Sequence, residues 1–96
     1  MRVSIGFLGM LRDQLGQKSL NVDLPEGAGF ADLMGAIAPL MEQKVGWAWD
    51  REGRGFSPRV VVSRKGANGM ALGRADVDAP LVDGEEFMVF PPLAGG

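Results

Sequence analysis

The sequence predicts an α+β domain in which one helix crosses one face of a mixed β-sheet. Three observations carry this prediction. Stretches near both ends of the chain alternate between apolar and other residues, as half-buried strands do. One stretch between them places apolar residues at helical spacing. The order strand, strand, helix, strand, short strand, strand is that of an α+β fold. Ninety-six residues are enough for one hydrophobic core but not for two.

The N-terminal third predicts two neighbouring antiparallel strands. Alternation over residues 2–8 predicts the first strand, whose buried side is formed by Val3, Ile5 and Phe7. Residues 9–16 predict a turn or a short helical segment, because Leu11 and Leu15 lie four positions apart. A second alternating stretch, residues 20–24, ends at Pro25-Glu26-Gly27, which is a typical strand stop.

The main helix is predicted over residues 30–41. One apolar stripe runs along it, made of Phe30, Leu33, Met34, Ile37, Leu40 and Met41. Its methionines indicate core packing rather than a cofactor site. Asp32 in the first turn favours the helix dipole and assists a weak glycine cap. Pro39 removes a helical hydrogen bond, so we expect a kink there, or a stop at Ala38 with a new turn beginning at Pro39.

The second half of the chain predicts shorter elements. Residues 45–58 indicate a long loop or an irregular hairpin turning at residues 50–53, with Trp47 and Trp49 as anchors on the core. The run Val60-Val61-Val62 is typical of a strand. The remaining elements are a turn at 65–69, a short edge strand at 70–72, a loop at 75–81, a turn at 83–84 and a last strand at 85–90.

Composition excludes several classes of function. The chain has no cysteine and no histidine, so disulfides, zinc sites, iron–sulfur clusters and Cys or His nucleophiles are excluded. A net charge of −2 gives no electrostatic case for nucleic-acid binding. No apolar run is long enough to span a membrane and no signal peptide is evident, so a cytoplasmic location is expected. No internal pair of carboxylates or nucleophile and base predicts freestanding catalysis, and no metal site is expected.

The last seven residues, Phe90-Pro91-Pro92-Leu93-Ala94-Gly95-Gly96, predict a functional tail rather than an idle terminus. Two prolines stiffen the exit from the last strand. Two glycines then make the end thin enough to pass where a side chain could not. We therefore divide the chain into a domain of residues 1–90 and a flexible tail of residues 91–96, with the α-carboxylate of Gly96 as its reactive group.

This tail resembles the C-terminus of the small subunit of molybdopterin synthase, a ubiquitin-like sulfur carrier. The resemblance continues upstream through residues 80–90, PLVDGEEFMVF, and includes residues 7–16, FLGMLRDQLG. It covers both ends of the chain and leaves out residues 42–59.

The resemblance implies a ubiquitin-like β-grasp, with a sheet of four to five strands and parallel first and last strands at its centre. Plant-type ferredoxins also use this shape, but the missing cysteines exclude them. In such a sheet Phe87 and Val89 face the helix together with Val3, Ile5 and Phe7. Leu8, Met88 and Phe90 then form an apolar surface beside the tail, where a partner protein docks. The expected partner-binding residues are Leu8, Met88, Phe90, Pro91, Pro92, Leu93 and Ala94.

The resemblance also implies the chemistry. An E1-like partner uses ATP to adenylate Gly96, and a sulfur donor protein then converts the carboxylate to a thiocarboxylate. The large synthase subunit receives this sulfur for a pterin precursor, with Gly95 keeping the tail thin. The chain itself binds no cofactor and acts as a non-catalytic donor subunit.

Three alternatives remain open at this stage. The chain could carry sulfur for thiamine or cysteine synthesis, although Pro91-Pro92 favours the molybdenum or tungsten branch. It could be a ubiquitin-like modifier joined through Gly96 to lysines of other proteins. A pure adaptor would not use its terminus, and the Gly-Gly end argues against that reading.

Overall fold

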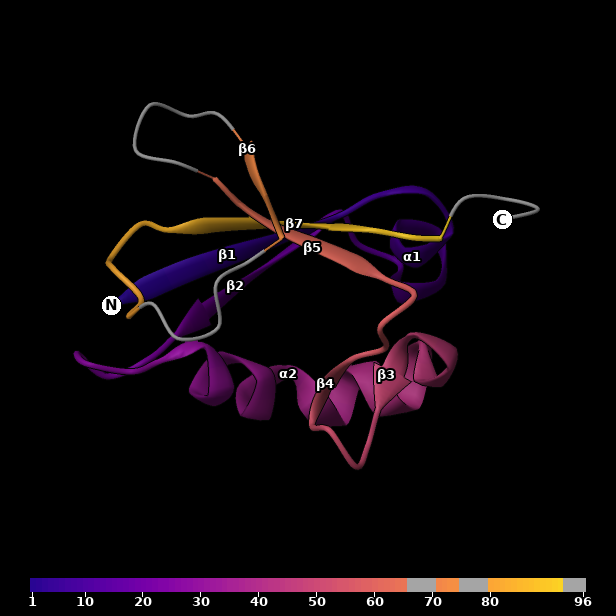
Figure 1. The fold of residues 1–96 in the computed structure, drawn as a ribbon, viewed down its shortest axis with the longest axis horizontal. Helices are drawn as coiled ribbons and strands as arrows, with labels where there is room; N and C mark the ends of the chain where they lie inside the picture. Colours follow the sequence, from indigo (N-terminus) through magenta and orange to yellow (C-terminus); the bar gives the residue numbers. More distant parts are fainter. Residues whose placement is uncertain (66–70, 75–79, 93–96) are drawn as a thin grey trace.

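The computed structural model describes residues 1–65, the backbone of residues 71–74, and residues 80–92. Within these residues, five strands form one sheet in the order β2-β1-β7-β5-β6 (Figure 1). The bounds are Arg2–Phe7 for β1, Ser19–Asp23 for β2, Val61–Lys65 for β5, Ala71–Arg74 for β6 and Glu86–Phe90 for β7. Strand β1 is antiparallel to β2 and parallel to β7, which is antiparallel to β5. The predicted mixed sheet with parallel first and last strands at its centre is confirmed.

Two α-helices are seen in the described part of the chain. Helix α1, Gly9–Leu15, connects β1 to β2 and buries Leu11 and Leu15, so the short helical segment is confirmed. Helix α2, Phe30–Lys44, lies across one face of the sheet (Figure 1). It begins as expected from Asp32, whose carboxylate accepts a 2.8 Å hydrogen bond from the N–H of Gly29. That bond satisfies one of the free N–H groups at the helix start.

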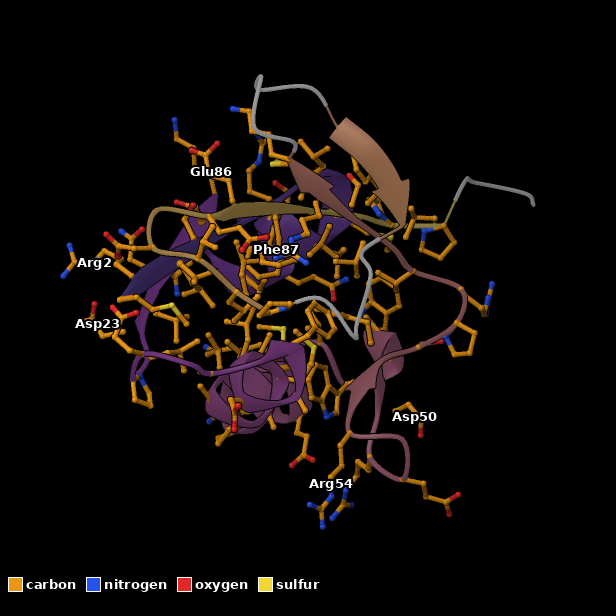
Figure 2. All side chains as sticks on the ribbon, turned by 60° about the vertical axis from the view of Figure 1, so that its left-hand side comes forward. Arg2, Asp23, Asp50, Arg54, Glu86 and Phe87 are labelled. Atoms are coloured by element: carbon orange, nitrogen blue, oxygen red, sulfur yellow. The ribbon has the colours of Figure 1, made fainter. Side chains whose placement is uncertain are left out.

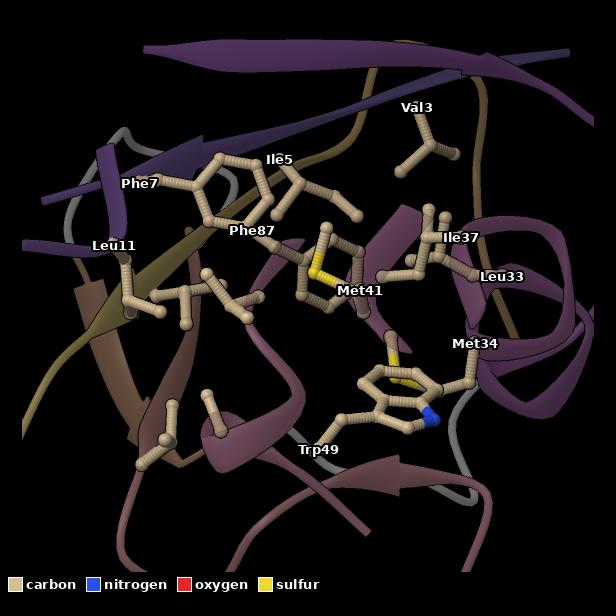
Figure 3. Close-up of a cluster of buried hydrophobic side chains, with 14 of the residues drawn as sticks. Val3, Ile5, Phe7, Leu11, Leu33, Met34, Ile37, Met41, Trp49 and Phe87 are labelled. Carbon is tan, nitrogen blue, oxygen red and sulfur yellow. The ribbon is translucent and has the colours of Figure 1, made fainter. Parts of the chain in front are cut away.

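The core lies between α2 and the sheet (Figure 3). Strands β1 and β7 supply fully buried side chains, namely Val3, Ile5, Phe7, Phe87 and Val89. Helix α2 supplies Leu33, Met34, Ile37 and Met41 from its apolar stripe. These are the faces that the alternating and helical patterns predicted, and the methionines of the stripe pack in this core.

Pro39 does not end the helix. One continuous helix is assigned from Phe30 to Lys44, so the alternative stop at Ala38 is wrong. The reason is that the hydrogen bond missing at Pro39 lies on the solvent-exposed side of the helix. Proline cannot donate to the carbonyl of Gly35, four residues earlier. Both residues are exposed to solvent, so water can bond that carbonyl in place of the missing N–H. The buried stripe on the opposite face keeps the helix on the sheet.

Gly35→Ala should raise the stability of the domain. A Cβ built at Gly35 meets nothing within 4 Å, and glycine in a helix interior costs about 0.8–1 kcal/mol relative to alanine. Thermal denaturation should show a midpoint higher by roughly 4–8 °C. Gly6→Ala is the contrasting variant, because a Cβ there would lie 2.7 Å from the Met88 sulfur. An unchanged or lowered midpoint for Gly35→Ala would mean that the Pro39 ring requires glycine at this position.

The segment between α2 and β5 is an irregular hairpin, as predicted. It contains a short 3₁₀ helix, Gly46–Ala48, and a two-stranded sheet of β3, Trp49–Asp50, and β4, Gly55–Phe56. Trp49 is buried and packs edge-on against Phe56, with ring centroids 5.2 Å apart. Trp47 is 45% exposed, and its indole N–H donates to Gln14 of α1 at 2.7 Å. One tryptophan therefore anchors the hairpin to the core, and the other ties it to α1.

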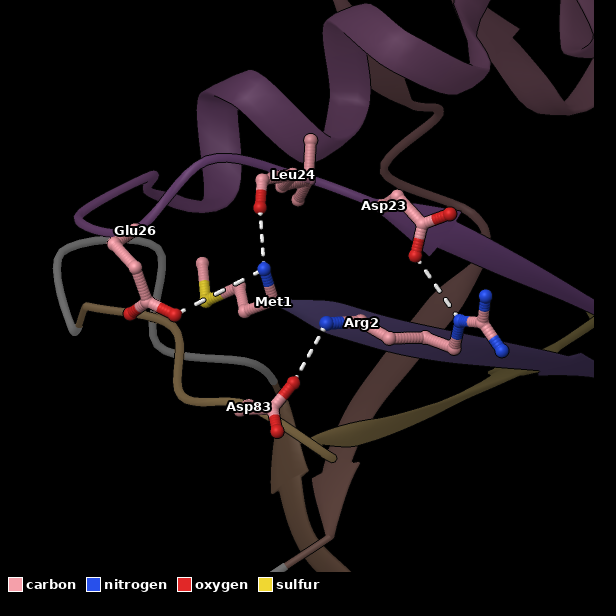
Figure 4. Close-up of polar contacts among 6 residues, drawn as sticks. All are labelled: Met1, Arg2, Asp23, Leu24, Glu26 and Asp83. Atoms are coloured by element: carbon pink, nitrogen blue, oxygen red, sulfur yellow. Dashed lines mark hydrogen bonds and ion pairs between the residues drawn. The ribbon is translucent and has the colours of Figure 1, made fainter.

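A polar corner sets the start of the two central strands (Figure 4). The N–H of Arg2 donates to the Asp83 carboxylate at 2.7 Å, and the Arg2 carbonyl accepts from Gly84 at 2.8 Å. Gly84 has a φ of +82°, which suits the predicted turn before β7. The Arg2 side chain hydrogen-bonds Asp23 at 3.0 Å and thereby holds the pKa of that carboxyl below its usual value. The small stabilising effect of the Arg2–Asp23 pair is present at neutral pH. It is lost as the pH falls through the pKa of Asp23 in the folded state.

Candidate functional site

The predicted site is organised around β7, which runs in the centre of the sheet and leads into the tail. Its neighbours are β1 on one side and β5 on the other, so both of its edges are hydrogen-bonded. Beyond Phe90 the structure describes Pro91 and Pro92, which are half-buried and outside any helix or strand. Leu93, Ala94, Gly95 and Gly96 lie outside the described residues. Their roles, and the division between residues 90 and 91, stay predictions.

Side chains of β7 alternate between the two faces of the sheet. Phe87, which is labelled in Figure 2, and Val89 point into the core and are buried. Met88 and Phe90 point away from α2 and are half-buried. We call the face turned away from α2 the outer face. The predicted facing of β7 is therefore confirmed, and the role of Met88 and Phe90 in binding a partner stays a prediction.

The apolar surface beside the tail contains one residue that the sequence did not single out. Val61 of β5 pairs directly with Phe90 and is 37% exposed. Leu8 follows β1, is half-buried, and donates its N–H to the carbonyl of Val89 at 3.2 Å. We call Leu8, Val61, Met88 and Phe90 the tail patch. Val61 is one of three consecutive valines, so the sequence does not show which of them faces outward. Only the register between β5 and β7 places Val61 beside Phe90.

Glycines bring neighbouring segments close to this patch. Gly6 pairs with Met88 across β1 and β7, and a Cβ at Gly6 would lie 2.7 Å from the Met88 sulfur. The Met88 side chain therefore packs against Gly6 on the outer face of the sheet. Gly9 has a φ of +59°, and a Cβ there would lie 3.2 Å from the ring of Pro91. The start of α1 thus closely supports the first residue of the predicted tail.

Charged residues around β7 are mostly paired. The guanidinium of Arg64 binds the Glu85 carboxylate through both its Nε and one terminal nitrogen, the latter at 2.8 Å. Lys65 approaches Glu86 at 2.8 Å, and Arg51 lies 3.8 Å from Glu42. Arg51, Arg64 and Lys65 are therefore each paired with a different acidic residue.

In residues 1–65, 71–74 and 80–92, no group of three or more Asp or Glu side chains could hold a metal ion. The same part of the chain contains no helix that is long and apolar enough to cross a membrane.

Comparison with solved structures identifies the fold. The chain superposes on SAMP1 from Haloferax volcanii with a TM-score of 0.76, at 22% identity and with 100% of both chains covered. The fold is that of SAMP1. It is the ubiquitin-like β-grasp that the sequence resemblance implied. No family profile matches the chain, and no curated protein matches it in sequence.

Two further neighbours share this fold. One, from Pyrococcus furiosus, is assigned as subunit 1 of molybdopterin converting factor. It has a TM-score of 0.60 at 21% identity, covering 97% of this chain and 99% of its own. The other belongs to a complex of subunits 1 and 2 of molybdopterin-converting factor from Helicobacter pylori. Its TM-score is 0.51 at 16% identity, with 100% of both chains covered. The suspected resemblance is thereby confirmed at the level of the fold.

Proposed function

We propose that this chain is a ubiquitin-like sulfur carrier that acts as the small subunit of molybdopterin synthase. The observation that carries the proposal is the Pro91-Pro92 exit from the central strand into a segment that contains Gly95-Gly96. The tail patch beside that exit supports it, because an apolar surface next to a thin tail suits docking followed by insertion. The neighbours that are molybdopterin-converting factor subunits support the same direction.

The proposed chemistry uses the Gly96 carboxylate, since the chain has no cysteine on which to carry sulfur. A carboxylate is a poor acyl donor until it is activated. An E1-like partner would join it to AMP from ATP, with release of pyrophosphate. A sulfur donor protein would then supply sulfur at the oxidation level of sulfide, which forms a bond to the acyl carbon, displaces AMP and leaves a thiocarboxylate. The large synthase subunit would receive that sulfur, so the chain supplies a reacting group and no freestanding catalysis.

A ubiquitin-like modifier is the second candidate function. The structural similarity to SAMP1, named as a small archaeal modifier protein, favours it. Conjugation would use the same adenylate of Gly96, with a lysine amine of another protein as the acceptor in place of sulfur. One chain could serve both uses, because activation is common to them. Sulfur carriage for thiamine or cysteine synthesis would also share this activation and differ in the receiving protein.

Gly96 should become a thiocarboxylate when the chain is incubated with its E1-like enzyme, ATP and a sulfur donor. Intact mass spectrometry should show the exchange of one oxygen for one sulfur. Deletion of Gly96 should abolish the exchange, and Gly95→Phe should block it while leaving the thermal midpoint unchanged, because the predicted domain ends at residue 90. An unchanged wild-type mass would refute the carrier function. Adducts on lysines of other proteins, without any sulfur exchange, would favour the modifier.

A further inference from the structure

Helix α1 forms a fixed support beside the end of β7 (Figure 1). Leu11 and Leu15 of this helix are buried in the core. Gln14, on the same helix, accepts the 2.7 Å hydrogen bond from the Trp47 indole, which ties α1 to the segment between α2 and β5. Core packing and this bond together hold α1 in place against the sheet.

Two contacts join the start of α1 to the end of β7. The N–H of Leu8 donates to the carbonyl of Val89 at 3.2 Å, directly after the last paired residues of β1 and β7. The next residue, Gly9, lies against the ring of Pro91. A Cβ built at Gly9 would lie 3.2 Å from Cγ and 3.9 Å from Cδ of that proline. Carbon atoms in ordinary contact are about 3.5–4.0 Å apart, so the ring occupies space that a side chain at residue 9 would need.

Gly9 meets two requirements that no other residue type meets together. Its φ of +59° lies in the left-handed region, which residues with a Cβ adopt at a cost. Asparagine tolerates that conformation, but it carries the Cβ that meets the Pro91 ring. Gly16 at the other end of α1 meets only the first requirement. Its φ is +77°, and a Cβ there would meet nothing within 4 Å.

We propose that Gly9 is a positioning residue for the reaction at Gly96, because it lets Pro91 pack against α1 and so fixes the direction in which the chain leaves the sheet. This inference rests on the proposed function, in which the tail enters the active site of an activating enzyme. Two consecutive prolines form a stiff segment, so a direction set at Pro91 is carried through Pro92. Docking at the tail patch would then present the tail in a preset direction. Preset geometry speeds a reaction because fewer orientations are lost at each turnover.

Gly9→Asn, with Gly16→Asn as the matched control, tests this role in the adenylation of the chain. Both variants place asparagine in left-handed backbone, so both should lower the thermal midpoint to a similar small extent. Only Gly9→Asn displaces Pro91. In pyrophosphate exchange with ATP and the E1-like enzyme, Gly9→Asn should lower kcat about three- to tenfold and leave KM for the chain unchanged, since the tail patch still docks. Gly16→Asn should match wild type, whereas a partly unfolded chain would raise KM and leave kcat unchanged.

Pro91→Ala completes a double-mutant cycle with Gly9→Asn. Alanine lacks the ring atoms that a Cβ at residue 9 would meet, so the contact is absent from the single and the double variant. Pro91→Ala should therefore lower kcat by itself, and adding Gly9→Asn should lower it no further. Effects on kcat that multiply would show that the two residues act independently, and that result overturns the proposal.

The direction of the tail is also measurable on the chain alone. The sequence has no cysteine, so Gln43→Cys and Leu93→Cys introduce a single pair of spin labels, one on α2 and one directly after the two prolines. Dipolar EPR should show a broader distribution of label distances for Gly9→Asn than for wild type or Gly16→Asn. An unchanged distribution, or a kcat as high as that of Gly16→Asn, overturns the positioning role and leaves the proposed function intact. Failure of the wild-type chain in pyrophosphate exchange would instead refute the proposed function, and the positioning role with it.

Discussion

Replacing Phe87 by alanine should lower the free energy of unfolding by about 3–5 kcal/mol. The ring is buried in the centre of the core, with its centroid 5.5 Å from that of Phe30. The guanidinium of Arg64 lies 5.7 Å from the same centroid, so a cation–π contact is lost as well. A loss of this size is a large share of the stability of a small domain. Urea denaturation would measure this change in unfolding free energy, provided that the free energy falls with urea concentration at the same slope in the variant and in the wild type.

Phe90→Ala is the matched control on the same strand. Phe90 lies on the outer face, where its ring is only half-buried beside Val61, so its removal should cost about 1–1.5 kcal/mol. Its expected effect is on docking, because removing an aromatic anchor from an interface often costs about 2 kcal/mol or more of binding free energy. Equal losses of stability for the two variants would show that the outer ring belongs to the core, and the tail patch would lose its basis.

Glu85→Ala should destabilise the domain by about 3–5 kcal/mol, as is typical when one partner of a buried ion pair is removed. The side chains of Glu85 and Arg64 are only 5% and 14% exposed. The carboxylate accepts from the guanidinium of Arg64 and, at 2.8 Å, from the N–H of Val82. A terminal nitrogen of Arg64 also donates to the carbonyl of Pro80 at 2.6 Å. The pair therefore ties β5 to the segment that enters β7.

The neighbouring ion pair provides the control for Glu85→Ala. Glu86 faces Lys65 at 2.8 Å, but the Glu86 side chain is 49% exposed. Exposed pairs contribute about 0–1 kcal/mol, so Glu86→Ala should change the unfolding free energy little. The double variant Arg64→Met with Glu85→Leu should recover much of the loss, because apolar residues of similar volume can replace a buried pair. A Glu85→Ala variant as stable as Glu86→Ala would contradict the structural role of the buried pair.

Local sequence patterns are sufficient to predict which faces of the central strands and of the main helix are buried. Period-two alternation places Val3, Ile5 and Phe7 on one side of a strand, whichever strands pair with it. Helical spacing likewise places the apolar residues of α2 on one side of that helix. The lack of cysteine and histidine excluded whole classes of chemistry before any fold was known. The Pro-Pro and Gly-Gly tail is also evident from the sequence alone, whereas the chemistry proposed at Gly96 rests on the resemblance of that tail to small subunits of molybdopterin synthase.

Features that depend on which strands pair with each other cannot be predicted from such local patterns. Val61 joins the tail patch because β5 pairs with β7 in one register, and three consecutive valines do not reveal which of them faces outward. Arg64 and Glu85 are 21 residues apart, and no spacing rule pairs them. Helix α2 continues through Pro39 because its lost bond faces solvent while its opposite side is packed. Ser63 is buried at a position that only the register of β5 against β7 places opposite Met88. Local patterns determine the face of a residue, whereas contacts between distant segments determine its neighbours.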